Sequence, residues 1–148
     1  MSYTNLYGIK SDFTAVELKQ YKNSWLFLPQ IYKILGEKYL NEKDTYKVLF
    51  TSKNLDKLER NVSKSKRTED RVLWLLVNQQ IFFTKDKTFI ADCIQKFFME
   101  DVRYYHPDNM DLIEWYDKIR KDISALDEKK YPYFIFNATS VTAVSYTH

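Results

Sequence analysis

Apolar side chains recur at helical spacing in the last third of the chain. From Asn109 to Leu126 they stand at intervals of 4, 3, 4 and 3 residues, at Leu112, Tyr116, Ile119, Ile123 and Leu126. Side chains at these intervals lie on one side of an α-helix. The pattern therefore predicts a helix over this segment with a single buried stripe, and Asp108 stands where an N-cap residue is expected.

Four more helices are predicted earlier in the chain. The segment from Thr88 to Asp101 carries apolar residues over a wide arc, which indicates deep burial, and Thr88 is a candidate cap. Narrower stripes predict helices from Pro29 to Leu40 and from Asn54 to Ser63. The segment from Thr68 to Gln79 contains the run VLWLLV, which fits either a helix or a buried strand.

Strand signals are fewer and shorter. Runs of β-forming residues suggest strands at Thr45 to Thr51, Ile81 to Thr84, Tyr133 to Phe136 and Val141 to Tyr146. Together with the helices they predict an α+β fold, in which four to six helices pack on a small, mainly antiparallel sheet. An all-α fold is the alternative. No glycine-, serine- or proline-rich linker divides the chain, so residues 1–148 are expected to form a single globular domain.

Composition argues against several classes of active site. Only 2 glycines, 3 prolines, 1 cysteine and 2 histidines occur in 148 residues. Phosphate-binding loops are built from glycine and a structural zinc site needs four Cys or His ligands, so neither a cofactor nor a metal is predicted. Cys93 lies on the apolar face of its predicted helix, where a thiol is buried and unreactive. No catalytic residue is predicted, and the chain is interpreted as a non-enzymatic protein.

No segment of the chain fits a membrane span or a secretory signal. The longest uninterrupted apolar run, Val72 to Val77, has six residues, whereas a membrane-spanning helix needs about 20. Charged residues interrupt the first 25 positions. A single cysteine fits a reducing compartment, so a cytoplasmic protein is predicted. The excess of lysine over arginine, with abundant Tyr, Ile, Phe and Asn, favours a bacterial or phage origin.

Charge is divided unevenly along the chain. Residues 1–87 carry 16 basic and 10 acidic side chains, whereas residues 88–148 carry 7 basic and 10 acidic ones. Acidic residues at three-residue steps form a slanting ridge on the last predicted helix: Asp108, Asp111, Glu114 and Asp117. Because arranged like charges select an oppositely charged partner, this ridge and the neighbouring Tyr104 and Tyr105 are the predicted partner-binding residues. Solubility and compensation of the helix dipole are the alternative role.

The strongest basic concentration lies between residues 53 and 71. It comprises Lys53, Lys57, Arg60, Lys64, Lys66, Arg67 and Arg71, interspersed with Asp56, Glu59, Glu69 and Asp70. A small nucleic-acid-binding or regulatory protein would use such a segment, and this is the alternative function. No aromatic residue lies between Lys53 and Arg71 to stack on bases, so a solvent-exposed helix pair is the favoured interpretation.

A His-Pro-Asp tripeptide, His106 to Asp108, stands between two predicted helices. Over residues 89–130 this arrangement resembles the signature loop of J-domain co-chaperones, which contacts an Hsp70 partner in that family. The family's helix before the loop is strongly basic, whereas here it carries more acidic than basic residues. A J-domain-like co-chaperone is the third function considered. In the local interpretation, Pro107 ends one helix and Asp108 caps the next.

The chain as a whole resembles the small immunity proteins that bacteria pair with polymorphic or contact-dependent toxins. The likeness is one of overall character: the size, the helix-and-sheet pattern, the missing catalytic residues and the closing segment YPYFIFNATSV at 131–141. It implies an inhibitor that binds a cognate toxin, often a nuclease, and covers its active site or another surface that it needs. The 12 tyrosines and 3 tryptophans fit this role, because both residue types are favoured anchors at protein interfaces.

Overall fold

Two strands at the start of the chain and one near its end form most of a sheet. β1 (Ser2–Ile9) lies between β2 (Ala15–Lys22) and β4 (Tyr133–Ser140), and the short β3 (Phe82–Phe83) completes the order β2-β1-β4-β3. All pairings within this four-stranded sheet are antiparallel. The structure is a computed structural model, and it describes residues 2–22, 27–40, 52–102, 108 and 110–140.

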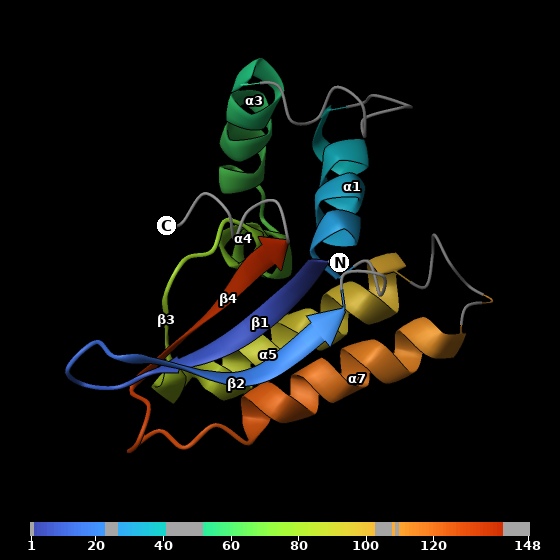
Figure 1. The fold of residues 1–148 in the computed structure, drawn as a ribbon. Helices are drawn as coiled ribbons and strands as arrows, with labels where there is room; N and C mark the ends of the chain where they lie inside the picture. Colours follow the sequence, from blue (N-terminus) through green and yellow to red (C-terminus); the bar gives the residue numbers. More distant parts are fainter. Residues whose placement is uncertain (1, 23–26, 41–51, 103–107, 109, 141–148) are drawn as a thin grey trace.

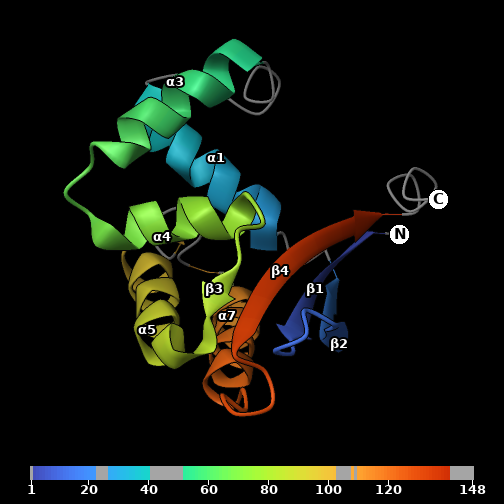
Figure 2. The same ribbon diagram turned by 90° about the vertical axis from the view of Figure 1, so that its left-hand side faces the viewer.

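Helices lie against one face of this sheet (Figures 1 and 2). A 3₁₀ turn, Thr84–Asp86, leads from β3 into α5 (Lys87–Phe97), which continues as a π-helical turn over Phe98–Val102. α5 packs beside α7 (Met110–Ser124). Three further helices, α1 (Phe27–Leu40), α3 (Ser52–Ser63) and α4 (Thr68–Val77), gather at the end of the sheet toward which β4 runs. This arrangement is the predicted α+β class.

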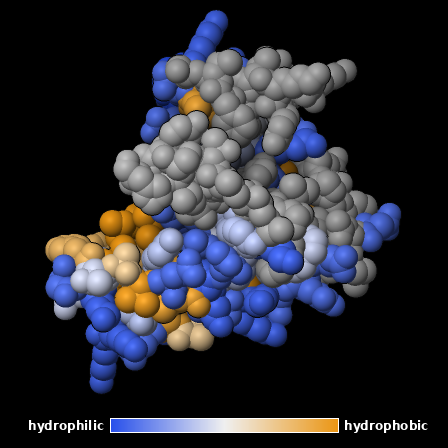
Figure 3. Space-filling model, viewed as in Figure 1, coloured by the Kyte–Doolittle hydropathy of each residue, from blue (hydrophilic) through white to orange (hydrophobic). Residues whose placement is uncertain are grey.

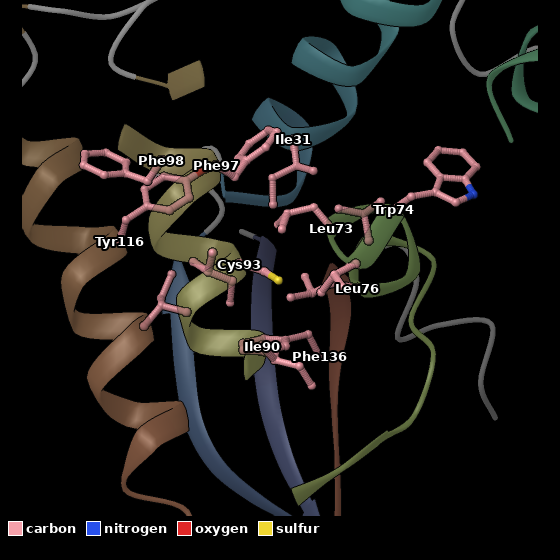
Figure 4. Packing of buried hydrophobic residues seen from close by; sticks show 14 of the residues in the cluster. Ile31, Leu73, Trp74, Leu76, Ile90, Cys93, Phe97, Phe98, Tyr116 and Phe136 are labelled. Atoms are coloured by element: carbon pink, nitrogen blue, oxygen red, sulfur yellow. The ribbon is translucent and has the colours of Figure 1, made fainter. Parts of the chain in front are cut away.

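The core lies between the sheet and the helices (Figure 4). Leu6, Phe134 and Phe136 point from the inner face of the sheet and are fully buried. The helices supply the facing side chains, with Phe97, Cys93 and Ile90 of α5 among them in Figure 4. The stripe predicted for the last helix is confirmed wherever side chains are described, since Tyr116, Ile119, Ile123 and Leu126 are all buried.

The predicted helices are confirmed with shifted ends. The segment that fitted either a helix or a buried strand is helix α4. Thr88 is not a cap: α5 begins one residue earlier, after Asp86, and the Lys87 amide donates to the carbonyl of Thr84. Because the 3₁₀ turn feeds directly into the helix, this backbone bond takes the place of a capping side chain.

The strand predictions fared less well. The segment beginning at Tyr133 is confirmed as β4 and extends to Ser140, whereas only Phe82 and Phe83 of the predicted third strand pair in the sheet. The strands predicted at 45–51 and 141–146 lie outside the described residues. β1 and β2, which supply half of the four-stranded sheet, were not predicted from the sequence.

A partly buried hydrogen bond joins β2 to α7. The Tyr21 hydroxyl donates to Oδ2 of Asp122 over 2.8 Å, although the two residues are 101 positions apart. Burial and this carboxylate raise the pKa of Tyr21 well above its ordinary value of 10.0, so the phenol stays protonated and keeps donating. The bond fixes the C-terminal half of α7 on the edge of the sheet.

Candidate functional site

The predicted partner-binding carboxylates lie on α7 or just before it. Asp108, Asp111 and Glu114 are exposed, so the first half of this helix presents negative charge to solvent. Tyr104 and Tyr105 lie outside the described residues, and their role stays a prediction. The first three residues of the acidic ridge are therefore available to a partner.

Asp117, the last member of the ridge, is neutralised by its own helix. Its carboxylate lies 2.7 Å from the guanidinium of Arg120 and 2.9 Å from the ammonium of Lys121. Hydrogen bonds from Lys121 and then Arg120 hold the pKa of Asp117 below its ordinary value of 3.8. Asp117 thus stays ionised, but it offers a partner less attraction than Glu114, one turn earlier.

An apolar groove lies beside this ridge, between α5 with its π-helical turn and α7. The rings of Phe98 and Tyr116 stack in it with centroids 5.0 Å apart, and Met99 is 49% exposed at its edge. The groove has a volume of about 230 Å³, and the rest of its lining is Gln95, Glu114, Asp117 and Arg120. We call it the α5–α7 groove. Its edge includes a π-helical turn, a rare feature that often stands at functional sites.

The α5–α7 groove is suited to holding an apolar side chain. A tyrosine phenol is uncharged at neutral pH, and burial raises the pKa of Tyr116 further above its ordinary value, so the floor stays uncharged in alkaline solution as well. The charged residues of the lining lie at the rim. They are Glu114 and the ion pair that Asp117 forms with Arg120. Within the described ranges, no three His, Cys, Asp or Glu side chains are grouped so that they could hold a metal ion.

A second concentration of ionisable groups, buried at its centre and exposed at its edge, lies between α1, α4 and the π-helical turn. We call it the ionic cluster, and its members are Lys38, Arg67, Glu69, Asp70, Lys96, Glu100 and Asp101. Asp70 lies at its centre and is fully buried. Oδ2 of Asp70 accepts hydrogen bonds from Lys38 at 2.7 Å, from Nε of Arg67 at 3.1 Å and from the Tyr39 hydroxyl.

Arg67 joins the remaining carboxylates of the ionic cluster. Its guanidinium lies 3.1 Å from Glu69, 3.0 Å from Glu100 and 3.0 Å from Asp101. Burial lowers the pKa of Arg67, but the carboxylates, led by Asp70, outweigh burial and raise it above its ordinary value. For Asp101, burial dominates over Lys38 and Arg67, and its pKa is raised. Three cations and four carboxylates thus pair with one another, which joins helices together rather than presenting a free acid or base.

The single cysteine lies beside the ionic cluster. Cys93 is buried, as predicted, and faces a surface depression of about 430 Å³ that Phe89 and Lys96 also line. Burial, with Glu69 and Asp92 nearby, raises the pKa of the thiol to about 11. The sulfur is therefore a neutral thiol at physiological pH, and a neutral thiol is a poor nucleophile.

Comparisons with known proteins place this chain in no family. No family model, no curated protein and no solved structure matches it. Among the described helices, none combines the length and the apolar composition needed to span a membrane. His106 and Pro107 of the tripeptide lie outside the described residues, so the J-domain resemblance is not tested by the geometry.

The acidic ridge was predictable from the spacing of its residues, whereas the groove and the ionic cluster were not. Phe98 and Met99 fall within the helix predicted from Thr88 to Asp101, but their position beside Tyr116 depends on how α5 and α7 pack. Nothing in the local spacing points to the cluster, since Lys38 is 32 residues from Asp70 and 63 from Asp101. The one local signal was the pair of acidic residues, Glu69 and Asp70, at the start of a helix that is otherwise apolar.

Proposed function

We propose that this chain works by binding another protein, and that the α5–α7 groove with its acidic rim is the contact surface. The finer proposal is an immunity-type inhibitor, acting in the bacterial cytoplasm, which covers the active site of a cognate toxin or another surface that it needs. The observation that carries the proposal is Met99, a large apolar side chain that is 49% exposed and lines the groove together with Phe98, Tyr116 and Glu114.

The groove defines the chemistry of the partner's contact. Its volume of about 230 Å³ suits one large apolar side chain, and such buried anchors supply most of the binding energy at protein interfaces. Asp111 and Glu114 are exposed on the same helix, so we expect lysine or arginine beside that anchor. A toxin acting on nucleic acid carries basic residues around its active site, because its substrate is an anion.

The test begins with the identity of the partner. The tagged chain is used to capture proteins from its source organism, and each captured protein is expressed with and without the chain. An inhibitor restores growth when its toxin is co-expressed. If no captured protein is toxic, or if co-expression does not restore growth, the inhibitor proposal is wrong.

Two variants then test the surface. Met99→Lys places a charge in the apolar groove and Glu114→Lys reverses the rim, so each is expected to weaken binding at least about tenfold, as for an interface anchor. Glu128→Lys, an exposed carboxylate outside the groove, is the matched control and should bind normally. Calorimetry with the purified partner measures all three affinities. Unchanged binding by both groove variants would place the contact elsewhere, even if the chain still neutralised its toxin.

A further inference from the structure

A row of cations lies along the outer face of α3 and continues to Lys64, the residue after the helix ends. Lys53, Lys57, Arg60 and Lys64 follow one another at intervals of 4, 3 and 4 residues, and all four are exposed. At 100° per residue they fall within an arc of about 60° along the helix. We call this row the basic stripe. It is about 16 Å long, because its ends are 11 positions apart at 1.5 Å each.

The opposite face of α3 is fixed to the rest of the fold. Leu58 and Val62 are fully buried, and Nδ2 of Asn61 donates to the backbone carbonyl of Tyr39 in α1 over 2.8 Å. These contacts hold the basic stripe toward solvent. Figures 1 and 2 place α3 at the end of the molecule away from α7, and Figure 3 shows blue, hydrophilic atoms over α3 while orange atoms gather over the sheet.

The basic stripe and the exposed Lys66 are the part of the basic segment that remains available to a partner. Arg67 is held in the ionic cluster, and Arg71 donates to the carbonyl of Ser65 and to the hydroxyl of Thr68. By contrast, no described carboxylate lies within ion-pair distance of any cation of the stripe. Tertiary structure thus divides the basic segment into charges held by contacts within the fold, Arg67 and Arg71, and charges left to solvent.

We propose that the basic stripe binds the phosphate backbone of double-stranded nucleic acid without sequence preference. Four cations over about 16 Å match a polyanion whose phosphates rise about 3.4 Å apart along each strand. The stripe has no aromatic side chain for stacking on unpaired bases, which favours a duplex over a single strand. It also has no apolar side chain to insert into a bilayer, because Leu58 and Val62 are buried, which disfavours a membrane surface. This function goes beyond the protein contact at the α5–α7 groove.

Salt-dependent binding to a duplex tests the proposal. The purified chain is titrated into fluorescein-labelled duplex DNA, and separately duplex RNA, of about 20 base pairs and mixed sequence, at 50 to 200 mM NaCl. Four phosphate contacts predict a slope of log affinity against log salt of about −3.6, and hence a loss of roughly a hundredfold over this range. Absence of duplex binding at 50 mM salt would overturn the proposal.

Charge reversal then locates the site. Lys57→Glu with Arg60→Glu should weaken binding at least about tenfold and flatten the salt slope by about 2 units. Lys19→Glu with Lys22→Glu, on the exposed strand β2, makes the same change in net charge and should have a much smaller effect. Equal losses in the two double variants would mean that only net charge matters, and would overturn the proposal.

Two further measurements distinguish this proposal from binding to a membrane surface and from the protein contact at the α5–α7 groove. Vesicles of phosphatidylserine and phosphatidylcholine serve as the competing anionic surface, and tighter binding to them than to the duplex would overturn the assignment to nucleic acid. Met99→Lys should bind the duplex normally. The protein-binding proposal and the nucleic-acid proposal therefore fail independently.

Discussion

Lys38 and Asp70 form an ion pair of 2.7 Å between α1 and α4 at the centre of the ionic cluster. The Asp70 carboxylate is fully buried and the Lys38 side chain is 19% exposed. A carboxylate at such a position is stable only when its charge is matched, and here Lys38 and Arg67 match it. The position of α1 on α4 therefore depends on a charge balance as well as on apolar packing.

Asp70→Asn should destabilise the protein by about 2–4 kcal/mol. The change keeps the shape of the side chain but leaves Lys38 and Arg67 without their shared carboxylate, and breaking a buried pair costs about 3–5 kcal/mol. We expect a smaller loss than for a fully buried pair, because Arg67 is partly exposed and keeps its contacts with other carboxylates. Urea unfolding measures the loss. Asp92→Asn, at an exposed position, should stay within about 0.5 kcal/mol, and an equal effect of both changes would contradict a central role for Asp70.

Gly8→Ala should cost about 1–3 kcal/mol, because β1 passes too close to its neighbours for a methyl group. A Cβ at position 8 would lie 2.6 Å from Cγ of Tyr131 and 2.8 Å from Cδ1 of Leu18. Shortening Leu18 to alanine in the Gly8→Ala background removes one clash, so the two changes together should cost less than their sum. Strictly additive free energies of unfolding would show that Leu18 does not limit the space.

Gln79→Gly should be more stable than Gln79→Ala by about 1 kcal/mol. Gln79 has a φ of 59°, a left-handed conformation that disfavours any side chain with a Cβ. It ends α4 in a Schellman motif, with Gln79 donating to Leu76 and Gln80 to Leu75. Both variants lose the weak hydrogen bond from the Ala138 amide to the Gln79 side chain. The difference between their free energies of unfolding therefore reports the cost of the left-handed backbone conformation alone. Equal melting temperatures for the two variants would contradict strain at this position.

Stability should fall between about pH 10 and about pH 12, in part through Tyr39. Burial, and then the hydrogen bond to Asp70, raise the pKa of this phenol from 10.0 to about 12. In that range the unfolded chain releases the proton while the folded protein keeps it, so the unfolded state binds fewer protons and gains stability as pH rises. Tyr39→Phe removes this contribution, and its free energy of unfolding should decline less steeply over the same range. Parallel curves for the variant and the parent protein would rule out the raised pKa of Tyr39.

The helices were predictable because helical periodicity is a local property. The stripe through Tyr116, Ile119 and Ile123 needed only spacing to be identified, and all three side chains are buried. The N-terminal hairpin was not predictable in the same way. Its inner face includes Thr4 and Gly8, and the pairing of Leu6 with Lys19 and Tyr7 with Glu17 leaves an extra residue in β2. This bulge breaks the alternation of apolar and polar positions that marks a strand.

The amino-acid sequence determined the helices, the α+β class and the excess of acid in the last third of the chain, because these follow from neighbouring residues. Tertiary structure decided which charges are available to a partner. Asp70 and Arg67 meet inside the ionic cluster, whereas Glu114 and Lys57 remain at the surface. Ion pairing depends on distance through space and on burial, and the spacing of residues along a chain fixes neither.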